Sequence, residues 1–184
     1  MSKAGTKMVF TTISILITLL LVSGCQSIAS TRIYNTPKLV KQYSSVEVDE
    51  YKGGKIINGP KQYMDTMSNS GTYFMIRDLV TRDNETIQLY VQILLNDWAF
   101  FNSAYWENGN KATFIEIDST TGSGMSGSYV LETFGVEIPE SLLKKKYDSA
   151  QDLKVMIYGK RANREIVIQN AYIKGFYDYM TENK

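Results

Sequence analysis

The chain has 184 residues, a formal net charge of +1, one cysteine and no histidine. The absence of histidine excludes catalysis by a Ser-His-Asp or Cys-His constellation and removes imidazole ligands for zinc or copper. The near-neutral balance of charge argues against electrostatic binding of nucleic acid, which requires a concentrated basic surface.

The first 24 residues form a basic and then apolar leader. Lys3 and Lys7 are the only charged side chains before Cys25, and residues 8–22 are apolar apart from four serines and threonines. This order is typical of a secretory signal, and the run is shorter than the about 20 residues of a membrane-spanning helix. We therefore predict a signal peptide at residues 1–24.

The stretch Val22-Ser23-Gly24-Cys25 resembles the lipobox of bacterial lipoproteins. In that family, signal peptidase II cuts before the cysteine, whose thiol receives a diacylglyceryl group. The resemblance implies lipid attachment at Cys25 and the membrane as a partner, and two or more acyl chains anchor a protein stably. The alternative is a plain signal peptide or a transmembrane anchor in which the cysteine is incidental.

The residue after the cysteine indicates in which membrane the protein is anchored. Gram-negative lipoproteins retained in the inner membrane tend to carry Asp there, and this chain has Gln26. The resemblance thus implies an outer-membrane anchor facing the periplasm in a Gram-negative cell. In a Gram-positive cell it implies the cytoplasmic membrane, with the domain facing outward.

Behind the leader we expect a lipidated cysteine and polar tether at residues 25–43 and one globular domain at residues 44–184. Removing residues 1–24 takes away two lysines and no acid, so the net charge changes from +1 to −1. Lipid on Cys25 leaves no disulfide within the chain. An exported domain of this kind must therefore be held by its core.

Residues 86–95 give the clearest strand, because apolar and polar side chains alternate through them as in a half-buried antiparallel strand. Residues 72–80 predict a preceding strand, and Asp83-Asn84 lies between the two. We therefore expect a hairpin.

Residues 98–106 predict an aromatic strand, with Trp98 and Trp106 on one face and Phe101 and Tyr105 on the other. Together with residues 86–95 and 113–118, this strand would form a meander. The Ser- and Gly-rich residues 119–128 predict a flexible loop before the next strand.

The last part of the chain predicts two helices around a hairpin. Pro139 suits the first position of a helix, and Asn170 can cap a final one. Between them, residues 153–158 and 165–168 predict the hairpin. The expected fold is α+β, with a single mostly antiparallel sheet and two helices from the C-terminal half packed on it.

Aromatic residues are the main candidates for a binding site, because Trp and Tyr are frequent at binding hot spots. The candidate partner-binding residues are Trp98, Phe101, Tyr105 and Trp106. Packing in the core is the competing explanation for all four.

Two carboxylate pairs are the candidates for catalysis. Glu116 with Asp118, and Glu47 with Asp49, are two positions apart and would point the same way from a strand. Paired carboxylates can hydrolyse glycosides or hold calcium. A solvated strand face is the competing explanation.

Four further segments carry a second resemblance. Residues 98–105, 132–136, 158–160 and 172–176 resemble small uncharacterised bacterial lipoproteins. The resemblance spans about half of the chain, and it implies a fold and no activity.

From these features we expect a lipid-anchored envelope domain that binds and does not catalyse, with no cofactor, no metal and no nucleic acid as partner. The expected partner is an envelope protein or a secreted protein, such as the toxin of an immunity or inhibitor lipoprotein. A glycan-binding domain, or a cell-wall enzyme acting through carboxylates alone, is the alternative.

Overall fold

The computed structural model describes residues 34–49, 53–64, 71–124 and 127–184. The chain divides into two units, residues 1–30 and 31–184, and the fold described here is that of the second. The expected signal peptide and Cys25 lie outside the described residues. Among the described helices, none is long and apolar enough to span a membrane.

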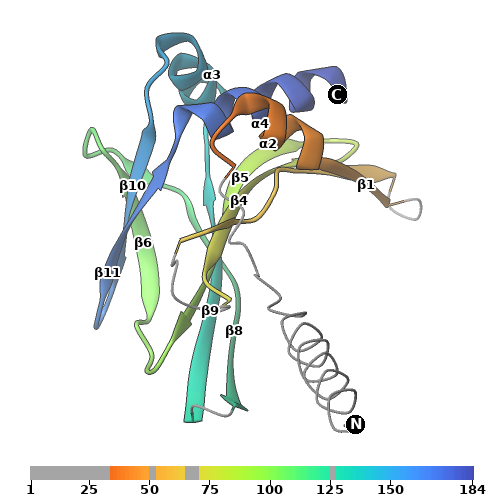
Figure 1. The fold of residues 1–184 in the computed structure, drawn as a ribbon. Helices are drawn as coiled ribbons and strands as arrows, with labels where there is room; N and C mark the ends of the chain where they lie inside the picture. The colour runs from red at the N-terminus through yellow and green to blue at the C-terminus, as the bar shows by residue number, and fades with distance from the viewer. Residues whose placement is uncertain (1–33, 50–52, 65–70, 125–126) are drawn as a thin grey trace, which may run out of the picture. The chain divides into compact units, whose positions relative to one another are not determined.

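Helices and two antiparallel sheets make up this unit (Figure 1). The helices are α2 (Pro37–Tyr43), α3 (Glu140–Ser149) and α4 (Asn170–Glu182). The seven-stranded sheet holds β1 (Ser45–Asp49), β2 (Gly54–Asn58), β4 (Tyr73–Val80), β5 (Glu85–Leu95), β9 (Gly127–Glu137) and β8 (Phe114–Gly124) in this spatial order, with β3 (Gln62–Tyr63) beside β4. The four-stranded sheet holds β11 (Asn163–Ile168), β10 (Leu153–Gly159), β6 (Phe101–Trp106) and β7 (Lys111–Ala112).

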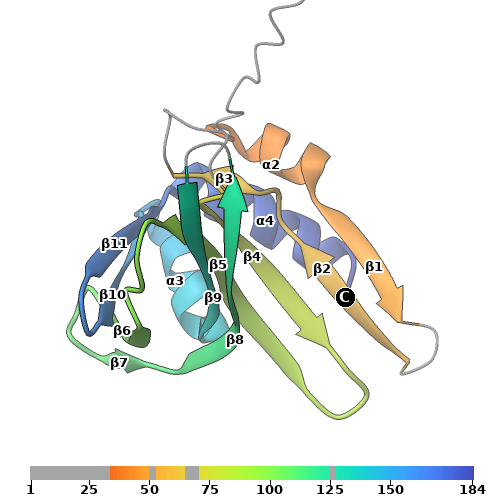
Figure 2. The same cartoon turned by 90° about the horizontal axis from the view of Figure 1, so that it is seen from below.

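The α+β class, the β4–β5 hairpin and the two late helices are confirmed, but the single sheet is wrong. The expected meander would have paired β6 with β5, whereas β6 pairs with β10 and β7. The chain leaves the large sheet after Leu95 and enters the small one at Phe101. Figure 2 shows the two sheets as separate layers. Local alternation identifies a strand but not its partner, which here lies about 50 residues further along the chain.

The main core lies between these layers and under α4. From the large sheet, Phe74, Ile76, Leu89, Val91, Phe134 and Val136 are buried; the small sheet adds Val155, Ile157, Ile166 and Ile168, and α4 adds Tyr172, Ile173, Phe176 and Met180. The strand residues alternate along their strands, and those of α4 recur at helical spacing. The alternation expected through residues 86–95 is therefore confirmed, because Leu89 and Val91 point into this core.

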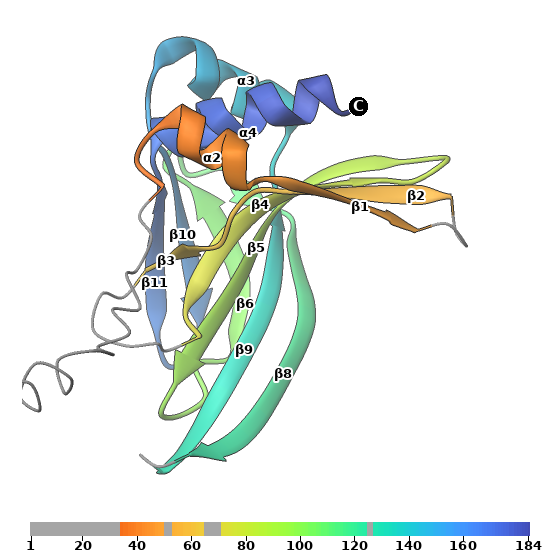
Figure 3. The ribbon, with the colours of Figure 1, turned by 45° about the vertical axis from the view of Figure 1, so that its right-hand side comes forward.

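Residues 37–43, which the sequence analysis assigned to the tether, form α2 and pack on α4. Val40 is fully buried, and Lys41 bonds Glu182 at 2.6 Å. The absence of a side chain at Gly175 permits this contact, because a Cβ there would lie 2.3 Å from the Pro37 carbonyl oxygen. Figure 3 shows α2 and α4 together over β1 and β2.

The expected loop at residues 119–128 is also wrong, since most of it belongs to the long β8–β9 hairpin. Ser119 to Gly124 pair in register with residues 127–132 of β9. Backbone hydrogen bonding forms this strand although its side chains are small and polar, so the composition indicated a loop. Strand β8 is a sheet edge, and its residues from Glu116 to Thr121 are exposed.

Candidate functional site

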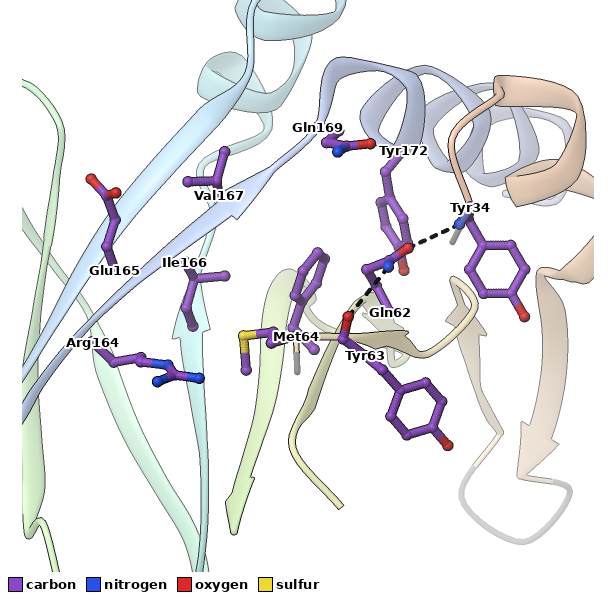
Figure 4. A pocket seen from close by; sticks show the side chains of 11 residues that line it. Tyr34, Gln62, Tyr63, Met64, Arg164, Glu165, Ile166, Val167, Gln169 and Tyr172 are labelled. Carbon is purple, nitrogen blue, oxygen red and sulfur yellow. Dashed lines mark hydrogen bonds between the residues drawn. The ribbon is translucent and has the colours of Figure 1, made fainter. Parts of the chain in front are cut away.

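A cleft of about 440 Å³ lies where β3 of the large sheet faces β11 of the small one (Figure 4). The residues that line it are Tyr34, Gln62, Tyr63, Met64, Phe74, Arg164, Glu165, Ile166, Val167, Gln169 and Tyr172. Its volume and its mixture of apolar and polar walls are typical of sites for small molecules or single peptide side chains.

Strand β11 lines this cleft with its edge. Four consecutive residues, 164–167, contribute to the wall, whereas a strand that lined it with one face would contribute alternate residues. In the described part of the chain, β11 pairs with β10 alone and β3 pairs with β4 alone. The cleft is therefore flanked by two strand edges that have no partner strand there.

Apolar side chains form the floor of the cleft. Phe74 and Ile166 are almost fully buried, and Tyr172 is 1% exposed. The Tyr172 hydroxyl donates to the Pro60 carbonyl oxygen at 2.7 Å and accepts from the Ile76 N–H at 3.3 Å. Burial also raises the pKa of Tyr172 far above its usual range. This hydroxyl therefore has a structural role and is not available to a ligand.

The rim of the cleft is polar. The Gln62 side chain accepts from the Tyr34 N–H at 3.0 Å and donates to the Tyr63 carbonyl oxygen at 3.4 Å, which joins the segment before α2 to β3. Figure 4 shows Arg164 pointing from β11 into the space beside β3, while Glu165 points away from it. The cleft thus has the positive charge of Arg164 at its rim and an apolar floor.

The sequence-predicted aromatic residues do not line this cleft. Phe101 and Trp106 are 8% and 6% exposed and belong to the core. Phe101 was expected to share a face with Tyr105, and this is wrong. A register shift between Tyr158 and Gly159 turns Phe101 inward, against Phe134 at 5.5 Å between ring centres. Such irregularities break the period of two on which the prediction depended.

Two of the four predicted residues, Tyr105 and Trp106, line an outer groove of about 700 Å³ on the small sheet. The other residues of this outer groove are Ser103, Glu107, Gly109, Lys154, Met156, Tyr158 and Glu165. Tyr158 is 41% exposed and meets Tyr105 edge to face at 5.6 Å. Sequence reasoning missed Tyr158, although alternation through residues 153–158 could have placed it outward.

Trp98 lies in neither the cleft nor the outer groove. It precedes β6 instead of belonging to a strand, and its ring stacks on Phe100 at 5.7 Å and 17° between planes. The four predicted residues are therefore distributed over the core, the outer groove and the connection between the sheets.

The expected carboxylate pair at residues 116 and 118 does not form. A bulge in β8 places Glu116 opposite Phe134 and Asp118 opposite Thr133, so the two side chains leave opposite faces of the sheet. Glu47 accepts a hydrogen bond from Asn58, and the Asp49 side chain lies outside the description. Within the described residues, no cluster of three or more acidic, His or Cys side chains could hold a metal ion.

Comparison with known proteins assigns no family. No family model matches the chain, and no curated protein or solved structure is significantly similar to it. The cleft and the outer groove are therefore interpreted from their own chemistry.

Proposed function

We propose that this chain is a membrane-tethered, non-catalytic binding domain of the cell envelope, and that its cleft takes an extended segment of an envelope or secreted protein. The two strand edges beside the cleft, which have no partner strand among the described residues, are the observation that carries this proposal. An extended peptide that adds to such an edge gains main-chain hydrogen bonds, and pockets for alternate side chains give it specificity.

The cleft supports one kind of segment more than others. An apolar side chain would pack against Phe74 and Ile166, and the positive charge of Arg164 would attract an acidic side chain. The ionisable groups around the cleft do not form an acid beside a base, because Glu165 points away and the Tyr172 hydroxyl is occupied. Binding accounts for this chemistry better than catalysis does.

Site-specific photo-crosslinking in the native envelope tests the proposal. A photoreactive side chain at Val167, which is 39% exposed on β11, should give a discrete adduct. The matched control is Val48, 68% exposed on β1, the edge strand of the other sheet. Arg164→Glu should abolish the Val167 adduct. Equal adducts at both valines, or an Arg164→Glu variant that crosslinks normally, would contradict binding at the cleft.

The identity of the crosslinked protein separates the alternatives within this proposal. A secreted toxin would make the chain an immunity or inhibitor lipoprotein, whereas an envelope component would make it an accessory subunit. The membrane tether is tested separately. Cys25→Ser should accumulate as an unprocessed precursor without lipid, and labelled fatty acid entering that variant would contradict the lipid anchor.

A glycan ligand is a second candidate, favoured by the outer groove. Exposed Tyr158, held edge to face by Tyr105 and flanked by Lys154 and Glu165, offers a ring and polar partners to a sugar. Tyr158→Ala should then abolish retention on cell-wall glycan without changing the Val167 adduct. Unchanged retention would remove the outer groove from consideration.

A further inference from the structure

Two turns meet at one end of the folded unit, at the end opposite α3 (Figures 1 and 3). One is the connection between β5 and β6, and the other is the β10–β11 turn. Backbone hydrogen bonds join them: the Lys160 N–H donates to the Phe100 carbonyl at 3.3 Å, and the Arg161 N–H donates to the Ala99 carbonyl at 3.1 Å. We call Trp98, Phe100, Lys160 and Arg161 the aromatic corner.

The aromatic corner holds an apolar ring at the surface in an unfavourable backbone conformation. Phe100 is 40% exposed and has a φ of 55°. Bulky L-residues rarely adopt this left-handed region, where Cβ crowds the backbone. A residue that is both strained and exposed, in a position where Asn or Gly would fit more easily, indicates a role other than stability.

The corner is held firmly from inside the protein. The buried Glu132 carboxylate accepts the N–H groups of Ala99, Phe100 and Phe101 at 2.6, 3.0 and 2.9 Å. The half-buried Trp98 ring stacks against the exposed Phe100 ring. Both rings are therefore positioned before any partner arrives, which lowers the entropy lost on contact.

Cations surround the exposed ring. The Lys160 amine and the Arg161 guanidinium lie 5.6 and 5.4 Å from the centre of the Phe100 ring, and Arg161 also bonds Asp97 at 2.6 Å. Lys160 and Arg161 against Asp97 leave the surface of these turns with a net positive charge, and the Glu132 carboxylate lies buried beneath them. Aromatic rings beside Lys or Arg are the combination found at the membrane–water interface, where rings enter the headgroup region and cations meet lipid phosphates.

We propose that the aromatic corner rests on the anionic headgroup surface of the membrane to which the chain is tethered. The inference rests on the lipid anchor at Cys25, which belongs to the proposed function, and it adds a second, protein-mediated contact. The corner fits a headgroup layer because its positive charge is complementary to lipid phosphate and its apolar rings lie beside the cations. A contact at this end would orient the domain on the membrane.

Tryptophan fluorescence can test this contact directly. The chain has two tryptophans, and Trp106 is 6% exposed whereas Trp98 is half-buried, so Trp98 is the more accessible of the two to a quencher. We would reconstitute the lipidated mature chain, which begins at Cys25, into vesicles of phosphatidylcholine, with or without phosphatidylglycerol, whose acyl chains are brominated. Trp98 emission should be quenched in the anionic vesicles and much less in the neutral ones. Trp98→Phe should show no quenching, and its remaining emission reports that the domain is folded.

Paired variants assign the contact to the corner. Lys160→Gln with Arg161→Gln should lose the quenching, as should Phe100→Ser. Lys144→Gln with Lys145→Gln on α3 removes the same charge from the opposite end and should keep it. Equal quenching in neutral and anionic vesicles, or loss in both double variants, would overturn the proposal. A chain that floats with the vesicles while Trp98 stays unquenched contradicts the corner alone, whereas a chain that fails to float contradicts the lipid anchor itself.

Discussion

Two buried carboxylates of the large sheet differ in whether hydrogen-bond donors surround them. Glu132 on β9 is 4% exposed and accepts three backbone hydrogen bonds from residues 99–101. Asp78 on β4 is fully buried, and neither of its oxygens has a hydrogen-bond partner among the described residues. The same chemical group therefore stabilises the fold in one place and destabilises it in another, and what decides is the supply of donors.

The groups around Asp78 explain why its buried carboxylate destabilises the fold. Burial, and after it the nearby Glu85, raise the pKa of its carboxyl to about 6, while Lys184 acts in the opposite direction. Lys184 pairs with Glu85 and Glu140 instead of bonding Asp78. The charged groups Lys184, Glu85 and Glu140 therefore pair with one another and not with Asp78.

Removing the Glu132 carboxylate should lower the free energy of unfolding more than any other change proposed here. Glu132→Ala leaves three backbone donors without their acceptor where the chain passes between the sheets. Each buried unsatisfied donor costs roughly 1–3 kcal/mol, so we expect a loss of about 5 kcal/mol, which threatens a marginally stable domain. Urea denaturation measures it, with Glu137→Gln on the same strand as control. A loss no larger than that of the control would mean that Glu132 does not hold the crossing.

The aromatic residues of β6 should fall into two groups, buried rings that stabilise the fold and an outer ring that does not. Phe101→Ala and Trp106→Ala remove buried rings and should each cost about 3–5 kcal/mol. Tyr105→Ala, on the outer face, should cost about 1 kcal/mol or less. Thermal melts of the three variants decide the matter. Three equally large losses would remove Tyr105 from any binding surface.

Relieving the unsatisfied carboxylate should stabilise the protein at neutral pH. The pKa of Asp78 is about 6 in the folded state against 3.8 for an unperturbed aspartate, so between these pH values the folded protein retains a proton that the unfolded chain loses. Native stability should therefore fall as the pH rises from about 4 to about 6, and the full cost persists above that. Asp78→Asn should gain about 2–3 kcal/mol at pH 8 and almost nothing at pH 4.

Stability measured by urea denaturation across this pH range checks the Asp78 prediction. Asp83→Asn, in the exposed β4–β5 turn, is the matched control and should leave the profile unchanged. A gain that is the same at pH 4 and pH 8 would show that the benefit comes from packing and not from the charge.

The smallest expected effect concerns the strain beside Glu132. Phe100→Asn places a residue that tolerates positive φ at a position with φ 55°. The strain relieved and the ring stacking lost on Trp98 oppose each other, so stability should change by no more than about 1 kcal/mol. Phe100→Ala keeps the strain and should be less stable than Phe100→Asn. The reverse order would mean that Glu132 does not hold this backbone against strain.

The sequence predicted the elements whose signal is local. Residues 73–80 and 85–95 form the expected hairpin, and α3 and α4 begin within two residues of Pro139 and Asn170. It did not predict the partner of β6, because that pairing with β10 depends on contacts distant in sequence. Two register shifts, near Ile117 and Gly159, turned side chains to faces that alternation did not assign.

The candidate site was less predictable than the fold. The cleft depends on the edges of β3 and β11 facing each other, and β3 is two residues long. No periodicity marks so short a strand, and its role arises only from the assembled sheets. Tyr105 and Tyr158 come together in the same way, across a strand pair that the sequence places about 50 residues apart.

The contact between α2 and α4 constrains when the domain can fold. Lys41 and Glu182 are 141 residues apart, and Val40 is buried only when the last helix is in place. Contacts of such long range form late and slow the folding rate. A chain synthesised in N-to-C order therefore cannot complete this fold until α4 has emerged from the ribosome. Until then, the face of α2 that carries Val40 has no α4 to pack against.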